Sequence, residues 1–130
     1  MLHHLSLGVR DLPRSIAFYD AVLRPIGWVR VWTDLRPGEP GQGAGYGLVE
    51  GPDQLAIKQR DAACASPGFH LALGADRPEV VDRFHALAMS SGGTDAGRPG
   101  LRPAYGPGYY AAFVCDPDGH RLEAVCLLDG

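Results

Sequence analysis

The sequence lacks three features that would assign it to a specialised class of protein. No apolar run approaches the roughly 20 residues that a membrane-spanning helix needs. Twelve lysines and arginines stand against 15 aspartates and glutamates, so the net charge of −3 gives no basic surface for nucleic acid or an anionic membrane. The N-terminus shows no basic segment followed by an apolar stretch, which a secretory signal would have. We therefore expect a cytoplasmic protein that binds neither nucleic acid nor membrane.

Cysteine is also scarce. The three cysteines, Cys64, Cys115 and Cys126, form no CxxC pair and no even set for a disulfide framework, which favours a reducing compartment. The 130 residues are 45% hydrophobic and 21% charged, an ordinary composition for one globular domain. With 18 glycines and 11 prolines, many turns are expected and long helices are not.

The chain repeats itself. Residues 4–8 read HLSLG, and residues 70–74 read HLALG, 66 positions later. Further along, VEGPD at 49–53 matches VCDPD at 114–118 with an offset of 65. Matches in the same order at nearly the same spacing indicate an internal duplication, although two unrelated strand starts with common residue types would give similar short matches.

Both halves predict the same order of elements. Alternating apolar residues predict a first strand, an amphipathic stretch opened by an acidic residue or proline predicts a helix, and further alternation predicts a closing hairpin. The expected elements are strands at 5–9, 28–33, 46–50, 55–59, 70–74, 109–115 and 120–127, helices at 13–26 and 78–91, and a loop at 92–108 in which a short strand could be hidden. We predict an α+β fold of two tandem βαβββ modules, about 1–62 and 66–130, that form one domain with a cupped mixed sheet and the helices outside.

The duplication brings out a candidate metal site. His4 and His70 occupy equivalent places at the start of equivalent strands, and the hairpin match makes Glu123 equivalent to Lys58. Two imidazoles and one carboxylate form a 2-His-1-carboxylate set, which leaves coordination positions open for substrate. The alternative is that the histidines are ordinary hydrogen-bonded strand residues and that Glu123 pairs with an arginine such as Arg121.

The segments HLSLGVRDLPRSIAFY, HLALG and FVCDPDGHRLE together resemble the vicinal oxygen chelate superfamily. This group includes glyoxalase I, extradiol dioxygenases, fosfomycin-resistance enzymes and bleomycin-binding proteins. The resemblance covers nearly the whole chain and implies paired βαβββ modules around one divalent metal, with His4, His70 and Glu123 as ligands. It also implies a homodimer and a substrate that binds the metal through two adjacent oxygens.

Departures from the family's sequence patterns reduce the number of reactions that the chain could catalyse. Glyoxalase I has a fourth ligand at the position that the hairpin match assigns to Lys58, and a protonated lysine is not an ordinary ligand, so a true glyoxalase I is disfavoured. Extradiol dioxygenases have a catalytic tyrosine where this chain has Phe113, although Tyr109 or Tyr105 could approach from the same strand and loop. Lys58, if it faces the cup, would suit an anionic oxygen of a substrate. Arg102 could meet a carboxylate of a substrate, but it is more simply interpreted as a surface arginine.

Two functions follow from these residues. The first is a metal-dependent enzyme acting on a small organic molecule with vicinal oxygens, with Glu123, Tyr109 and Lys58 as catalytic candidates and lyase, oxygenase or transferase chemistry left open. Its metal could be iron, manganese, zinc, nickel or cobalt, since imidazole and carboxylate suit all of them. The second is a non-catalytic protein that binds a drug or metabolite in the cup.

Overall fold

The computed structural model describes residues 1–62 and 65–128. Two βαβββ modules follow one another along the chain, as the duplication predicts. The first contains β1 (Leu5–Val9), α1 (Leu12–Leu23), β2 (Val29–Asp34), β3 (Gly43–Gly47) and β4 (Leu55–Gln59). The second contains β5 (Leu71–Gly74), α2 (Pro78–Ser90), β6 (Thr94–Leu101), the short 3-10 helix η1 (Pro103–Tyr105), β7 (Tyr109–Cys115) and β8 (Arg121–Leu127). Cys64 lies outside the described residues.

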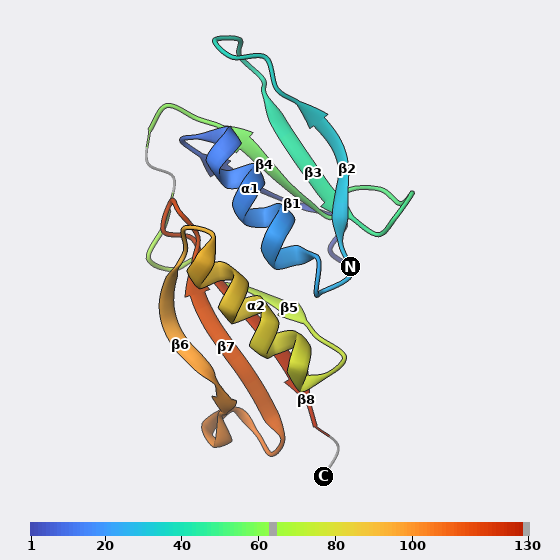
Figure 1. Ribbon diagram of the computed structural model, residues 1–130, viewed down its shortest axis with the longest axis vertical. Helices are drawn as coiled ribbons and strands as arrows, with labels where there is room; N and C mark the ends of the chain where they lie inside the picture. Colours follow the sequence, from blue (N-terminus) through green and yellow to red (C-terminus); the bar gives the residue numbers. More distant parts are fainter. Residues whose placement is uncertain (63–64, 129–130) are drawn as a thin grey trace.

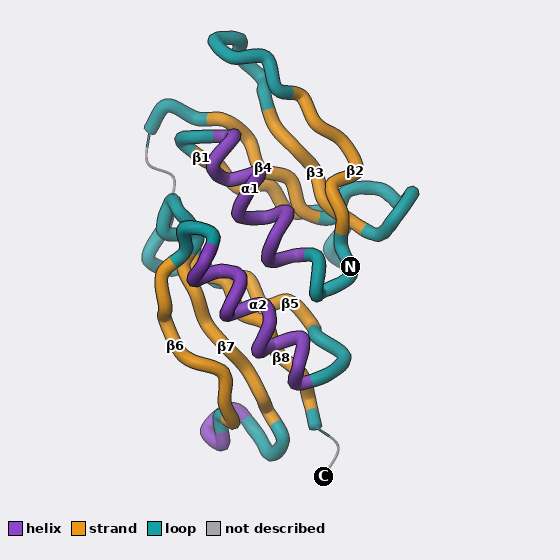
Figure 2. The backbone as a smooth tube through the Cα atoms, in the orientation of Figure 1, coloured by secondary structure: helices purple, strands orange, loops and turns teal. Residues whose placement is uncertain are grey.

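Each module has its own mixed sheet. The strand order is β1-β4-β3-β2 in the first and β5-β8-β7-β6 in the second; β1 pairs with β4 and β5 with β8 in parallel, and the other pairs are antiparallel. The tandem βαβββ fold is therefore confirmed, with the eight strands of the described chain divided between two four-stranded sheets. One helix covers one face of each sheet (Figures 1 and 2). We call the other face of each sheet its open face.

The segment expected to be a loop contains a strand. β6 runs from Thr94 to Leu101 and pairs with β7, with register shifts between Asp95 and Gly97 and between Gly97 and Gly100. Glycine and proline are poor strand formers, which is why the sequence TDAGRPGL does not stand out as a strand. The irregular pairing is consistent with bulges at the glycines.

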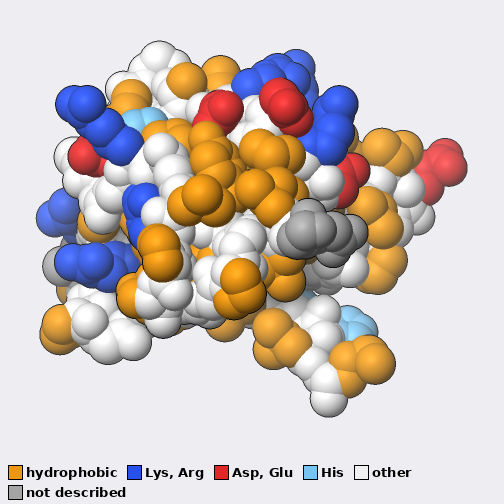
Figure 3. All heavy atoms as spheres, turned by 90° about the horizontal axis from the view of Figure 1, so that it is seen from below, with side chains coloured by type: hydrophobic (Ala, Val, Ile, Leu, Met, Phe, Trp, Pro, Cys, Tyr) orange, Lys and Arg blue, Asp and Glu red, His pale blue; other side chains and the backbone are white. Residues whose placement is uncertain are grey.

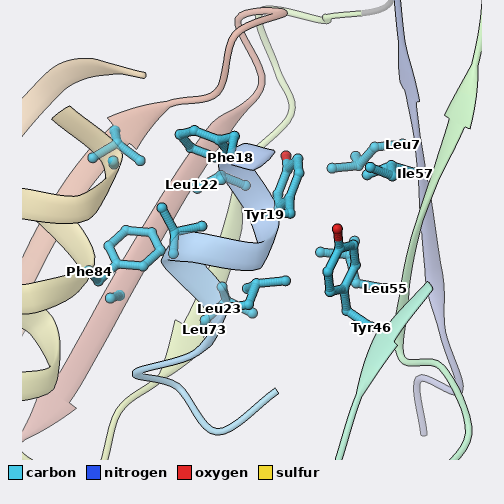
Figure 4. Packing of buried hydrophobic residues seen from close by; sticks show 14 of the residues in the cluster. Leu7, Phe18, Tyr19, Leu23, Tyr46, Leu55, Ile57, Leu73, Phe84 and Leu122 are labelled. Atoms are coloured by element: carbon cyan, nitrogen blue, oxygen red, sulfur yellow. The ribbon is translucent and has the colours of Figure 1, made fainter. Parts of the chain in front are cut away.

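The two modules share one hydrophobic core through their helices. α1 packs on its own sheet and also on α2, so it is apolar on more than one side and buries Phe18, Tyr19 and Leu23 completely. In Figure 4, Tyr46, Leu55, Leu7 and Ile57 lie on the side of the first sheet, while Phe84 and Leu122 approach α1 from the second module. Asp11 caps α1, its side chain accepting a hydrogen bond from the Arg14 amide at 3.2 Å. No helix in the described residues is long and apolar enough to cross a membrane.

A polar contact also joins the modules at the turn between β7 and β8. The Asp118 carboxylate, whose side chain is fully buried, accepts hydrogen bonds from the amide and Nε of Arg10 at 3.1 and 3.2 Å and from Ser15 Oγ at 3.4 Å. Tyr19 Oη donates to Asp116 at 2.6 Å, and burial, followed by the charge of Asp116, raises the pKa of this tyrosine. These contacts fix the second module's turn against the start of α1.

His120 adds a further link between the sheets. Its Nε2 lies 2.7 Å from the carbonyl oxygen of Gly8 on β1, and because a carbonyl can only accept, this nitrogen carries the hydrogen. The His120 side chain is buried and rests edge-on against the Phe69 ring. The turn therefore orients the two modules through buried hydrogen bonds as well as through the apolar core.

The strand register corrects one equivalence drawn from the sequence. β1 places Ser6 opposite Ala56, and β5 places Ala72, which matches Ser6 in the repeat, opposite Glu123. Ala56, not Lys58, is thus the counterpart of Glu123. The match of residues 49–53 with 114–118 is not a structural equivalence, because Val49 lies in the turn after β3 whereas Val114 lies within β7. Its offset of 65 therefore cannot be carried into β4 and β8, where Ala56 and Glu123 are 67 residues apart.

Candidate metal and substrate site

Glu123 belongs to the open face of the second sheet. Its neighbours on β8, Leu122 and Ala124, are completely buried under the helices, and side chains alternate between the two faces of a strand. Although Glu123 points away from the helices, its side chain is only 5% exposed. A carboxylate taken out of water at this position requires partners.

Two side chains contact the Glu123 carboxylate, one at each oxygen. His70 Nε2 lies 2.7 Å from Oε1, and Tyr109 Oη donates a hydrogen bond to Oε2. His70 directly precedes β5 and Tyr109 begins β7, so the two strands that flank β8 each supply one group. His70, Glu123 and Tyr109, which the sequence singles out, therefore have their side chains in contact at one place on the open face.

The hydrogen bond to Glu123 raises the pKa of Tyr109 to about 12, with burial and the negative charge of Glu123 as the further causes. At neutral pH the phenol thus keeps its proton and donates a hydrogen bond to the carboxylate. Phe113, opposite Glu123 in the register of β7 and β8, has its ring 5.8 Å from the His70 ring, centroid to centroid. Phe113 gives the site an apolar wall.

His4 does not join this group within one chain. It is exposed at the start of β1, and its Nδ1 lies 2.8 Å from the Nδ1 of His3. Seen from below, a segment with hydrophobic and histidine side chains projects from the body of the molecule (Figure 3). Among the residues that the structure describes, no three His, Cys, Asp or Glu side chains gather in a way that could hold a metal. Within one chain the structure thus brings His70 to Glu123 but does not bring His4 to them, and the three-ligand set stays a prediction.

The reason lies in how the modules pack. His4 and His70 precede equivalent strands of different sheets, and these sheets are joined through their helices, not through hydrogen bonds between strands. Equivalence in the repeat gives the two histidines the same place relative to their own sheets. It does not bring them to a common point.

Lys58 lies on the open face of the first sheet. Its Nζ is 5.2 Å from the centroid of the Trp32 ring, and Trp32 Nε1 donates to Asp53 at 3.1 Å. A Cβ at Gly45 would lie 2.0 Å from Trp32 Nε1, so the indole rests against this glycine. Lys58 and Glu123 thus belong to different sheets, and the first module has its own aromatic and cationic surface.

A sequence model of the glyoxalase/bleomycin resistance protein/dioxygenase superfamily matches residues 1–124. The chain belongs to this superfamily. A search of curated proteins finds no match.

Solved structures of the superfamily share the fold. A glyoxalase/bleomycin resistance protein from Albidiferax ferrireducens T118 is 29% identical, with a TM-score of 0.74 and 95% of each chain covered. A glyoxylase/bleomycin resistance protein/dioxygenase domain from Frankia sp. EAN1pec is 21% identical, with a TM-score of 0.75 over 100% of this chain and 93% of that one. A variant of the fosfomycin resistance protein FosX from Listeria monocytogenes, solved with Mn(II) and 1S,2S-dihydroxypropylphosphonic acid, is 16% identical, with a TM-score of 0.73 over 98% and 92% of the two chains.

The sequence favours a plain surface position for Arg102, but its guanidinium lies over the Phe113 ring, 5.4 Å from the centroid. It follows β6, the strand that the sequence does not resolve, so its place on the open face could not be inferred. Ala56 gives no signal in the sequence either, because its importance depends on the register of β1 and β4.

Proposed function

We propose that the protein is a divalent-metal-dependent enzyme that acts on a small organic molecule with two adjacent oxygen atoms. In this proposal His70 and Glu123 of one subunit bind the metal together with His4 of the partner subunit. The observation that carries the proposal is the contact between His70 Nε2 and Glu123 Oε1 on an otherwise open sheet face. An imidazole and a carboxylate from neighbouring strands are two of the three groups in a 2-His-1-carboxylate site.

One chain supplies two of the three protein ligands of such a site. His70 and Glu123 supply two ligands, and a divalent ion in a site of this type needs at least three from the protein. His4 is the same type of residue, stands at the repeat-equivalent position and is exposed, so it can reach a second copy of the chain. A dimer that sets the first module of one subunit against the second module of the other would bring the three together.

His4 would not arrive alone in such a dimer. β1 is paired with β4, and the open face of that sheet also presents Lys58. The proposal therefore places Lys58 of the partner subunit on the wall opposite Tyr109. Ala56 offers no ligand at the counterpart of Glu123, so three protein ligands and no fourth are expected, and a true glyoxalase I remains disfavoured.

The metal would supply Lewis-acid polarisation of the two substrate oxygens. The chain's own residues determine what surrounds them. Glu123 accepts the single O–H of the Tyr109 phenol. With Glu123 bound to the metal, the phenol would turn that O–H from the carboxylate to a substrate oxygen that gains negative charge and donate a hydrogen bond or a proton there. Phe113 excludes water from one side, and the ammonium of Lys58 favours an anionic form of the substrate. Whether the outcome is a lyase, oxygenase or transferase reaction depends on the substrate.

One feature favours the alternative of a non-catalytic drug- or metabolite-binding protein. Both oxygens of Glu123 already have partners in His70 and Tyr109, so the carboxylate is satisfied without an ion. A protein of this kind would bind its ligand in the cup with the metal-free site intact. Metal content separates the two functions.

The test is a complementation experiment. His4→Ala and Glu123→Ala are each expected to lose bound metal, measured by mass spectrometry of the purified protein, while His3→Ala, the neighbour of the same type, keeps it. When the two defective variants are unfolded, mixed and refolded together, about half of the dimers should pair one with the other, and each such dimer has one intact ligand set. Recovery of metal in the mixture supports the shared site. Wild-type protein that binds no divalent metal would refute the enzyme proposal, and a His4→Ala variant with full metal content would refute the ligand set.

A further inference from the structure

Arg102 is fixed on the open face of the second sheet. It follows β6, and its guanidinium lies over Phe113 while donating hydrogen bonds to the backbone carbonyls of Arg98 and Leu101. Two glycines make room for it. A Cβ at Gly97 would lie 3.2 Å from one terminal nitrogen of Arg102, and a Cβ at Gly100 would lie 3.2 Å from the other. Glycine at these two positions lets the guanidinium lie close to the strand.

The charge of Arg102 is not neutralised within the described residues. Four arginines of the described residues form ion pairs with carboxylates: Arg10 and Arg14 with Asp118, Arg30 with Asp20 and Arg36 with Asp34. Arg102 is among the arginines that do not, and it differs from the exposed ones in being held on an aromatic ring. In the described part of the chain no Asp or Glu oxygen lies within 4.0 Å of the guanidinium of Arg102. A guanidinium has five N–H donors, and the contacts with backbone carbonyls leave some of them free for a planar anion such as a carboxylate.

Arg102 is also close to the candidate metal site. Phe113 lies between them. The Arg102 guanidinium covers its ring, and the centroid of that ring is 5.8 Å from the centroid of the His70 ring. Phe113 is also the residue of β7 that pairs with Glu123 on β8. A small ligand with one end at His70 and Glu123 would have its carbon skeleton along Phe113 and its other end beside Arg102.

We propose that Arg102 is the anion-binding residue of this site, and that the substrate carries an oxoacid group, a carboxylate or a phosphonate, in addition to its two adjacent oxygens. This inference rests on the proposed function for the position of the oxygens, but the anion site depends only on Arg102 and its surroundings. A guanidinium placed over an aromatic ring by hydrogen bonds to the backbone is preorganised, so less entropy is lost when it binds the anion.

Calorimetry with four small probes tests the proposal. Catechol and 3,4-dihydroxybenzoate share two adjacent oxygens and differ by one carboxylate, whereas benzoate and phenylphosphonate carry the anion without those oxygens. Wild-type protein loaded with Mn²⁺ should bind dihydroxybenzoate about tenfold more tightly than catechol, the effect of one hydrogen-bonded charged group. Arg102→Gln should reduce this ratio to about twofold and weaken benzoate or phenylphosphonate binding, whichever anion the site prefers.

Two matched variants serve as controls. Arg98→Gln removes an exposed arginine from the same strand and should leave the ratio unchanged. Arg102→Lys keeps the charge but loses the planar fork, so it should retain part of the preference and show that the loss in Arg102→Gln is not a loss of folding.

The outcomes separate this inference from the proposed function. Equal affinities for catechol and dihydroxybenzoate in the wild type, a preference that survives Arg102→Gln, or no binding of any probe would overturn the anion site. Catechol binding that requires Glu123 but gains nothing from the carboxylate would leave the proposed function standing and remove this inference. Benzoate or phenylphosphonate binding that requires Arg102, without catechol binding at any metal concentration, would support the anion site and count against the proposed function.

Discussion

Replacement of Asp118 by alanine is expected to destabilise the protein more than replacement of any exposed acidic residue by alanine. Its buried carboxylate accepts hydrogen bonds from the Arg10 amide and Ser15 Oγ and also contacts the side chains of Arg10 and Arg14. The amide and hydroxyl are donors to a buried charged acceptor, and together they contribute about 2 kcal/mol. The two arginine side chains are 50% and 42% exposed, so each ion pair adds only about 0.5 kcal/mol.

The free energy of unfolding should therefore fall by about 3 kcal/mol in Asp118→Ala, out of a total of about 5–15 kcal/mol. For a domain of this size the melting temperature should fall by about 12 °C, at about 4 °C per kcal/mol. Urea denaturation followed by tryptophan fluorescence measures the change. Asp11→Ala is the comparison, because Asp11 is exposed and caps α1 through a single hydrogen bond, for which about 1 kcal/mol is expected.

If Asp118→Ala lowers the free energy of unfolding by no more than Asp11→Ala does, the reasoning is refuted. It would mean that the buried contacts of the turn contribute nothing beyond an ordinary surface cap. Asp118→Asn retains an acceptor oxygen but no charge, so its loss of unfolding free energy should lie between the losses of Asp11→Ala and Asp118→Ala.

Two further predictions concern the open faces. The hydrogen bond to Glu123 raises the pKa of the Tyr109 phenol to about 12, against about 10 for an ordinary tyrosine, so this bond stabilises the fold fully below about pH 10 and is lost as the pH rises through about 12. Because the pKa values of Tyr19, Tyr46 and Tyr110 are raised as well, the ionisation of Tyr109 is measured as the difference between ultraviolet absorbance titrations of the wild type and Tyr109→Phe, and in the background of Glu123→Gln the same difference should move toward about pH 10. Ala56→Glu should raise the affinity for Zn²⁺ about tenfold, because Ala56 is the counterpart of Glu123, whereas Lys58→Glu should raise it less, and the reverse order would contradict the pairing register of β1 with β4 and of β5 with β8.

The overall fold could be predicted because the duplication makes each local pattern appear twice. HLSLG and HLALG place two equivalent strands, the amphipathic stretches place the helices and the later alternation places the closing hairpins, and the structure confirms this order of elements. The first strand of the first hairpin is predicted too late, at 46–50, whereas β3 runs from Gly43 to Gly47 in a glycine-rich segment. β6 could not be predicted because Gly97 and Gly100 remove the alternation on which a strand assignment depends. These glycines form part of the floor beneath Arg102, so the same residues that hide the strand from the sequence make the anion site possible.

The ligand set could be predicted only in part. His70, Glu123 and Tyr109 come together because they lie on three adjacent strands of one sheet, and hairpin order in the sequence is enough to bring them there. The equivalence of Lys58 failed for a different reason. The match of 49–53 with 114–118 joins Val49, in the turn after β3, to Val114, inside β7, so its offset does not hold for the strands that follow.

A repeated sequence does not determine which module His4 faces. Two equivalent modules can face each other within one chain or between two chains, and every sequence equivalence is the same in both cases. In this chain the helices and the turn around Asp118 occupy the contact between the modules, so each open face is left with half of a candidate site: His4 and Lys58 on one, His70, Glu123 and Arg102 on the other. The residues that hold the two modules together thus lie on the helix-covered faces of the sheets, and the candidate site residues lie on the open faces. Substitution of the exposed His4 should change metal binding with little effect on unfolding, while substitutions around Asp118 should lower the free energy of unfolding and leave the residues of the open faces in place.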